Sequence, residues 1–148
     1  MISAEIRIVK RRLDDYQSYK DLAAYADRQA LMTQVEIEQA GQPRSPRWDK
    51  VAPNQNHPEL SSYLNELISE QAQYEREAAG YRLKMQAIEA YIDANFDGPT
   101  RDLVKRHYID GLRYDDLRDE MDLSPAAMVN SVTRAMEDLE FDQAKCLI

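Results

Sequence analysis

The sequence predicts an all-α fold, in which a long antiparallel helical hairpin with coiled-coil-like spacing precedes a small trihelical helix-turn-helix unit. Apolar residues recur with heptad spacing over two long stretches, and only 4 of the 148 residues are glycine. Four of the 6 prolines fall between Pro43 and Pro58, where an irregular segment interrupts the helices. Three short amphipathic stretches follow near the C-terminus. We therefore expect an oligomerising hairpin over residues 1–96 and a helix-turn-helix unit over residues 97–148.

The first long helix is predicted over about residues 3–39. Its apolar residues begin with alternating three- and four-residue spacing, which is the pattern of a helix that packs along one seam. From Ala23 to Ala30, small side chains then replace large ones in the pattern. They bury less apolar surface between helices but are compatible with a continuous helix. The residues of this pattern, in order, are Ile2, Ile6, Val9, Leu13, Tyr16, Ala23, Ala24, Ala26, Ala30, Met32, Val35 and Ile37.

A Pro-rich loop over residues 41–58 is expected to connect the two arms of the hairpin. Its basic residues Arg44, Arg47 and Lys50 flank Trp48, the only tryptophan of the chain. A basic cluster around an aromatic side chain can bind phosphates and stack on bases. Alternatively, Trp48 folds back and closes the end of the hairpin. The sequence leaves both interpretations open.

The second long helix is predicted over residues 59–96 and carries the clearest periodicity of the chain. Ten positions are spaced by four and three residues throughout, and only Gln71 among them is polar. Because a two-helix hairpin of this length leaves much apolar surface exposed, we expect a homodimer formed through this rod. The ten positions are Leu60, Leu64, Leu67, Gln71, Tyr74, Ala78, Tyr81, Met85, Ile88 and Ile92.

The C-terminal unit is predicted as helices over residues 99–109 and 114–121 and a third helix that starts after Ser124. Gly111 suits the left-handed conformation that ends a helix. Ser124 is a good N-cap, and Pro125 is a good first helical residue. The expected core consists of Leu103, Tyr108, Leu112, Leu117, Met121, Leu123, Met128, Val132, Ala135, Met136 and Leu139.

Composition limits the classes of function. No apolar run of about 18 residues exists, so we expect no membrane span. The single cysteine, Cys146, excludes an internal disulfide, and the N-terminus lacks a signal-peptide pattern, so we expect a cytoplasmic protein. His57 and His107 are far apart, and no phosphate loop or metal-ligand spacing is present. We therefore expect no enzyme, no cofactor and no metal site.

The third helix of the C-terminal unit is the expected DNA-reading element. Asn130 could pair with adenine, and Ala126 or Ala127 could contact a thymine methyl group. Basic side chains of the preceding helices could reach phosphates. The predicted DNA-binding residues are Ala126, Ala127, Asn130, Thr133, Arg134, Arg113, Arg118, Lys105 and Arg106.

The C-terminal unit resembles the fourth region of bacterial sigma factors through its offsets after Ser124. The wider chain looks like phage late-transcription regulators of the RinA and ArpU type, from Pro46–Val51 through the heptad helix to Arg106–Leu112. The resemblance implies a phage or prophage transcriptional regulator that binds double-stranded promoter DNA and contacts host RNA polymerase. The matching residues after Ser124 are Met128, Val132, Arg134, Ala135 and Leu139, whereas Arg118 and Asp122 stand where the family prefers a small residue and glycine.

The charge distribution supports an alternative. The chain carries a net charge of −8, and residues 99–148 hold 7 basic and 11 acidic side chains. Generic DNA binders concentrate Lys and Arg, because phosphate neutralisation supplies much of their affinity. A helix-turn-helix can also retain its fold and bind protein instead of DNA. The alternative is therefore an acidic protein-binding regulator, or a phage inhibitor of a host nucleic-acid-binding protein.

Overall fold

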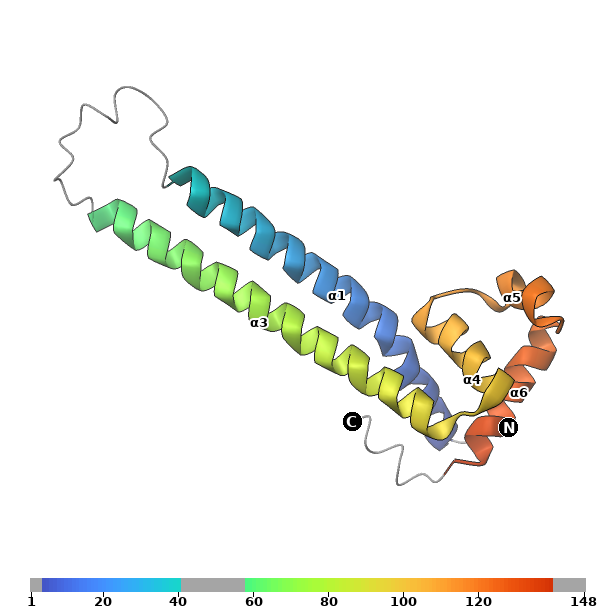
Figure 1. Cartoon of the computed structure of the whole chain (residues 1–148). Coiled ribbons are helices and arrows are strands. Elements are labelled where there is room, and N and C mark those ends of the chain that lie inside the picture. The colour runs from blue at the N-terminus through green and yellow to red at the C-terminus, as the bar shows by residue number, and fades with distance from the viewer. Residues whose placement is uncertain (1–3, 41–57, 140–148) are drawn as a thin grey trace. The chain divides into compact units, whose positions relative to one another are not determined.

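The computed structural model describes residues 4–40 and 58–139, and every regular element among them is helical (Figure 1). The predicted all-α class is thereby confirmed. None of the described helices has a stretch that is long and apolar enough to span a lipid bilayer. The elements are α1 (Ala4–Ala40), α3 (Pro58–Asn95), α4 (Gly98–Val104), η1 (Lys105–Ile109), α5 (Tyr114–Met121) and α6 (Pro125–Glu137).

The two long helices agree with their predicted limits to within one residue at each end. Helix α1 has 37 residues and α3 has 38. None of the ten heptad positions predicted for α3 is exposed, and Gln71 is half-buried among them. The apolar periodicity therefore identified the packed face of this helix correctly. In α1 the small residues continue the packed face, with Ala23, Ala26 and Ala30 all buried.

The chain divides into two compact units, and both boundaries fall within the long helices. Unit 1 comprises residues 1–21 and 82–148, and unit 2 comprises residues 22–81. The sequence had instead predicted a boundary near residue 96. The difference arises because the C-terminal helices pack on the first turns of α1 and the last turns of α3.

Unit 1 has one hydrophobic core, to which α1, α3 and all the C-terminal elements contribute. Leu13, Ile92 and Leu117 are fully buried in it, although they lie far apart in the sequence. The C-terminal helices therefore share their core with the long helices. The buried members are Ile6, Val9, Leu13, Tyr16, Ile88, Tyr91, Ile92, Phe96, Leu103, Val104, Tyr108, Leu117, Met128, Val132 and Met136.

Most of the predicted core of the C-terminal unit is confirmed. Six of its residues are buried, and Leu112, Met121, Ala135 and Leu139 pack against them. Leu123 was placed in the core incorrectly, since it is 40% exposed. It follows the left-handed residue Asp122 in the turn between α5 and α6, where the change of chain direction leaves its side chain in solvent.

The first C-terminal helix differs from the continuous α-helix predicted over residues 99–109. It is α-helical only to Val104 and continues as the π-helical segment η1. The amide of Asp110 donates to the carbonyl oxygen of Lys105, five residues back, at 3.0 Å. A π-helical turn inserts one residue into the register and rotates the following side chains. Val104, where the α-helix ends, and Tyr108 of η1 are both buried.

The end of η1 is closed by a left-handed glycine, as predicted. Gly111 has a φ of 74°, and the amide of Leu112 donates to the carbonyl oxygen of Arg106 at 3.1 Å. This hydrogen bond spans six positions, one more than the corresponding bond in the Schellman ending of an α-helix. From α1, Gln17 Nε2 donates to the carbonyl oxygens of Tyr108 at 3.0 Å and Ile109 at 2.7 Å. These bonds satisfy carbonyl groups that the end of a helix leaves unpaired.

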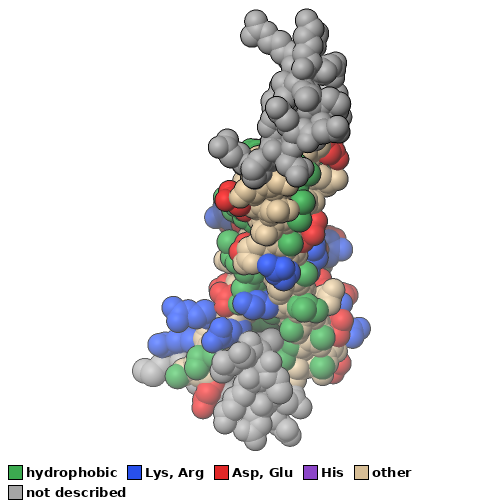
Figure 2. Space-filling model, turned by 90° about the vertical axis from the view of Figure 1, so that its left-hand side faces the viewer, with side chains coloured by type: hydrophobic (Ala, Val, Ile, Leu, Met, Phe, Trp, Pro, Cys, Tyr) green, Lys and Arg blue, Asp and Glu red, His purple; other side chains and the backbone are tan. Residues whose placement is uncertain are grey.

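Unit 2 contains parts of α1 and α3 whose buried residues are mostly small. Leu67 is its only large side chain among the buried ones in the described residues, and the others are Ala23, Ala26, Ala30, Thr33 and Ala78. Large apolar side chains are instead exposed, and on the face seen in Figure 2 hydrophobic side chains lie among polar and charged ones. The exposed large residues of unit 2 are Leu22, Tyr25, Leu31, Met32, Val35, Tyr63 and Ile68.

Candidate nucleic-acid interface

Helices α5 and α6 are joined by a tight turn at residues 122–124. Asp122 ends α5 with a φ of 54°, in the left-handed region where the resembled family prefers glycine. Aspartate is among the few other residues that adopt this conformation readily. The turn therefore forms although glycine is absent from it.

The start of α6 is fixed by Ser124, as predicted. Its hydroxyl oxygen accepts a hydrogen bond from the amide of Ala127 at 3.2 Å. Its carbonyl oxygen accepts the first intrahelical bond, from the amide of Met128 at 3.0 Å. Pro125 occupies the first turn, where the missing amide hydrogen costs nothing. The capped turn sets the position at which α6 leaves α5.

Helix α6 has one fully buried and one exposed face. Met128, Val132 and Met136 are spaced by four residues, and each is 0% exposed. The exposed face carries Asn130 and Arg134 with Ala126 one turn before them, again at four-residue spacing. Residues four apart lie along one side of a helix. The helix therefore presents a continuous stripe to solvent, which we call the α6 stripe: Ala126, Asn130 and Arg134.

The predicted DNA-binding residues differ in their exposure. Arg113 and Arg118 of the α5 region are exposed, like the three residues of the α6 stripe. Ala127, Thr133, Lys105 and Arg106 are half-buried. Five of the nine predicted residues are thus exposed, and they lie on or next to the two helices of the turn.

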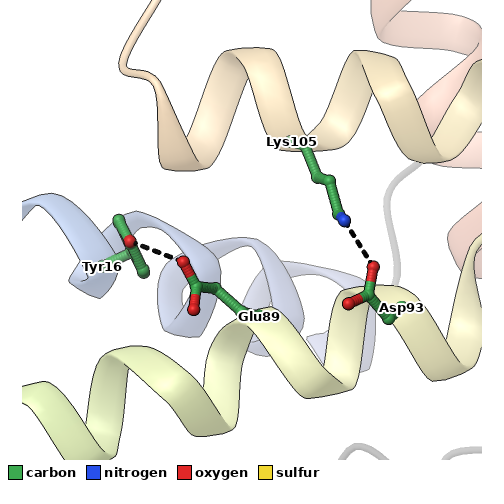
Figure 3. Close-up of polar contacts among 4 residues, drawn as sticks. All are labelled: Tyr16, Glu89, Asp93 and Lys105. Carbon is green, nitrogen blue, oxygen red and sulfur yellow. Dashed lines mark hydrogen bonds and ion pairs between the residues drawn. The ribbon is translucent and has the colours of Figure 1, made fainter.

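Lys105 and Arg106, which were also predicted to bind phosphate, have acidic partners within unit 1. Lys105 Nζ lies 2.6 Å from Asp93 Oδ1 of α3, as Figure 3 shows. Arg106 of η1 pairs with Glu120 of α5 at 2.5 Å. Their side chains remain about two-fifths exposed, so each pair contributes little to stability because water screens it. These contacts orient the two cations towards neighbouring helices.

Thr133 is also engaged, and its partner lies on α1. Its hydroxyl donates to the carbonyl oxygen of Val129 at 2.9 Å and accepts from Lys10 Nζ at 3.1 Å. Sequence reasoning did not include α1 in the site. The signal was present, because Arg7, Lys10 and Arg11 follow the three- and four-residue spacing of one helix face.

Acidic side chains dominate the exposed surface of α5. Asp115 and Asp116 lie in its first turn, where the helix dipole favours negative charge. The carboxylate of Asp116 accepts a hydrogen bond from the amide of Arg113 at 3.3 Å. Asp119, Glu120 and Asp122 are exposed further along. Polyanions therefore meet an unfavourable field at α5 that Arg113 and Arg118 offset only in part.

A ring cluster supports the start of α5 from inside unit 1. His107 stacks on Tyr114 with ring centroids 3.9 Å apart, and its Nδ1 lies 2.9 Å from the carbonyl oxygen of Leu112. Burial raises the pKa of Tyr108 and of Tyr114. Within the described residues, no group of three or more His, Cys, Asp or Glu side chains is placed to hold a metal ion. The cluster packs η1 against the start of α5.

The loop residues Arg44, Arg47, Trp48 and Lys50 lie outside the described residues, so their predicted contact role stays a prediction. No family model, curated protein or solved structure matches the chain. The resemblance to sigma region four and to the RinA and ArpU type therefore depends on the quoted residues alone.

Proposed function

We propose that the protein is a phage or prophage transcriptional regulator that binds promoter DNA through α5 and α6. The observation that carries this proposal is the α6 stripe, which a capped tight turn directs into solvent. In helix-turn-helix proteins the second helix of such a pair enters the major groove. The remaining helices of unit 1 bury the opposite face of α6 and hold it in place.

The chemistry of the stripe suits contact with base edges. An asparagine amide can donate to and accept from adenine at once, and an arginine can bind guanine with two hydrogen bonds. A good bidentate contact of this kind discriminates between bases by about 1–3 kcal/mol. The alanine methyl groups allow close approach and could contact thymine.

The acidic surface of α5 limits the affinity that one copy of the protein can have for DNA. A single unit with few free cations should bind weakly, because it neutralises few phosphates. Two copies would bind two half-sites and recover affinity. We therefore propose that the protein acts as a cytoplasmic homodimer, with the long helices forming an antiparallel hairpin. In this proposal the acidic surface of α5 remains free for host RNA polymerase.

An electrophoretic mobility-shift titration against the DNA that flanks the gene would test this function. Asn130→Ala and Arg134→Ala should each weaken a saturable, sequence-selective shift by about tenfold, as expected for losing 1–3 kcal/mol of base contact. Asn65→Ala and Arg76→Ala are matched controls, since both residues are exposed on α3 in unit 2. Absence of any shift at low salt would contradict DNA binding.

A second candidate function is supported by the acidic face of α5. In this alternative the protein is a regulator or inhibitor that docks Asp115, Asp119 and neighbouring carboxylates on a basic host nucleic-acid-binding protein. Replacement of Asp115 and Asp119 by asparagine should then abolish capture of that partner. Under the DNA-binding proposal the same change should instead strengthen DNA binding, because it removes two charges that repel phosphate.

A further inference from the structure

The first turns of α1 carry a basic face that the proposed function has not used. Arg7 and Arg11 are exposed, and within the described part of the chain neither has an ion-pair partner. Around the helix Arg7 lies between Lys10 and Arg11, because these two residues follow it by three and by four positions. Arg12 follows one residue later and therefore points about 100° away, where it pairs with Asp15 at 3.9 Å.

This face lies beside α6 in unit 1. Lys10 Nζ donates to Thr133 Oγ1 at 3.1 Å, across 123 residues of sequence. Thr133 directly precedes Arg134 of the α6 stripe and flanks the exposed face of the helix. An ammonium group has three donors, and this bond uses one of them. The contact therefore holds a cation at the edge of the stripe with donors left for another acceptor.

We propose that Arg7, Lys10 and Arg11 bind the phosphates of one DNA strand while α6 occupies the adjacent major groove. This inference depends on the proposed DNA-binding function. Packed helices lie about 8–10 Å apart, and the major groove is about 12 Å wide. A helix packed beside a reading helix is therefore placed at the wall of the groove, where the phosphates are. Phosphate contacts of this kind set the register of the protein on DNA.

The face also accounts for how an acidic protein can bind a polyanion. The described residues of α1 up to Asp21 hold five basic and four acidic side chains, whereas the exposed surface of α5 is dominated by carboxylates. Two acidic residues of α1 lie near the basic face: Asp14, four residues after Lys10, and Asp15, four residues after Arg11, which pairs with Arg12. Burial raises the pKa of Asp14, against the opposing influence of His107 and Lys10. Asp14 therefore retains its charge less readily than an ordinary aspartate.

The test measures DNA affinity of the full chain as a function of salt for three proteins. Arg7→Gln/Arg11→Gln removes two proposed phosphate contacts. Arg12→Gln/Lys20→Gln is the matched control, with the same change of charge on the same helix at other positions. Each lost contact should reduce the slope of log K against log salt by about 0.9, so the Arg7/Arg11 variant should lose about 1.8. The ratio of the wild-type binding constant to that of the variant should therefore fall about twelvefold between about 50 and 200 mM salt.

Circular dichroism checks that all three proteins are equally helical, which surface substitutions on a helix should preserve. A reduced slope in the Arg7/Arg11 variant alone supports the inference. Equal slopes in three proteins that all bind DNA would overturn the inference and leave the proposed function intact. Failure of the wild-type chain to bind DNA even at 50 mM salt would overturn both.

Discussion

Nε2 of Gln17 on α1 lies 2.7 Å from the carbonyl oxygen of Ile109 and donates a hydrogen bond to it. The same amide reaches the carbonyl oxygen of Tyr108 at 3.0 Å. Gln17 thus contacts the end of η1, although Tyr108 and Ile109 follow it by 91 and 92 positions in the sequence. Because backbone carbonyls at a helix end need partners, α1 completes the fold of the C-terminal elements in unit 1.

Gln17→Ala should therefore destabilise the protein. The substitution leaves two partly buried carbonyl groups with poorer partners, and we expect the free energy of unfolding to fall by about 1–2 kcal/mol. Ser18→Ala is the control, since Ser18 is exposed on the next position of the same helix. Urea denaturation followed by circular dichroism measures both. Equal midpoints for the two variants would show that the Gln17 bonds contribute nothing.

Gly111→Ala should destabilise the protein more than Gly98→Ala. Both glycines have positive φ, 74° and 57°, so alanine is strained at either position by about 1–2 kcal/mol. At Gly111 a Cβ would also lie 3.3 Å from the Gln17 side chain, whereas at Gly98 no atom lies within 4 Å. The excess cost at Gly111 should disappear in a Gln17→Ala background, as a double-mutant cycle can measure. An unchanged excess would refute this contact.

Stability should fall in alkaline solution partly through Tyr16. Burial, together with the hydrogen bond and charge of Glu89, raises the pKa of Tyr16 to about 12 (Figure 3). Because the folded-state pKa lies above the unfolded value of about 10, the native state binds the proton more tightly. The contribution of the protonated Tyr16 to the free energy of unfolding is complete below pH 10 and is lost as the pH rises from about 10 towards 12.

Tyr16→Phe removes this titration and isolates its effect. Between pH 10 and 12, the free energy of unfolding of the wild type should fall more steeply than that of the variant, by up to about 1.4 kcal/mol per pH unit. Urea midpoints at several pH values provide the comparison. Parallel pH profiles would mean that Tyr16 ionises equally well in the folded and unfolded chains.

Unit 2 should mediate self-association. Its buried residues are mostly small, while Tyr25 and Met32 are 51% and 58% exposed and lie seven residues apart on one face of α1. A second copy that covers this heptad face would bury the larger side chains. Analytical ultracentrifugation at tens of micromolar should show a dimer, and Tyr25→Lys/Met32→Lys should yield a monomer. Gln73→Lys on the exposed surface of α3 is the control. A monomeric wild-type chain would exclude this role.

Local sequence chemistry predicted the elements that local interactions determine. The heptad positions of α3 identified its packed face because helix periodicity fixes which residues share a side. Ser124 and Pro125 located the start of α6, since capping requirements involve only neighbouring residues. Gly111 marked the end of η1 for the same reason.

Tertiary contacts determine the features that the sequence did not reveal. No local pattern predicted the π-helical hydrogen bonding of η1 or the burial of Val104 and Tyr108 in a core shared with α1 and α3. The spacing of Arg7, Lys10 and Arg11 indicates a basic face on α1, but only the Lys10–Thr133 contact, between residues 123 positions apart, shows that this face lies next to α6. Lys105 and Arg106 were predicted as free phosphate ligands, but their acidic partners come from other helices.

Cleavage of DNA by an iron chelate attached at position 130 tests most directly whether α6 faces DNA. Asn130→Cys in a Cys146→Ser background provides a single attachment site, because Cys146 is the only cysteine. If α6 faces DNA, we expect the chelate at position 130 to cut only a few base pairs of the shifted DNA. A chelate attached in the same way at position 73 of unit 2, in place of Gln73, should cut none. If the complex forms and its DNA is cut by the chelate at position 73 but not by the chelate at position 130, the proposal that α6 faces DNA is contradicted.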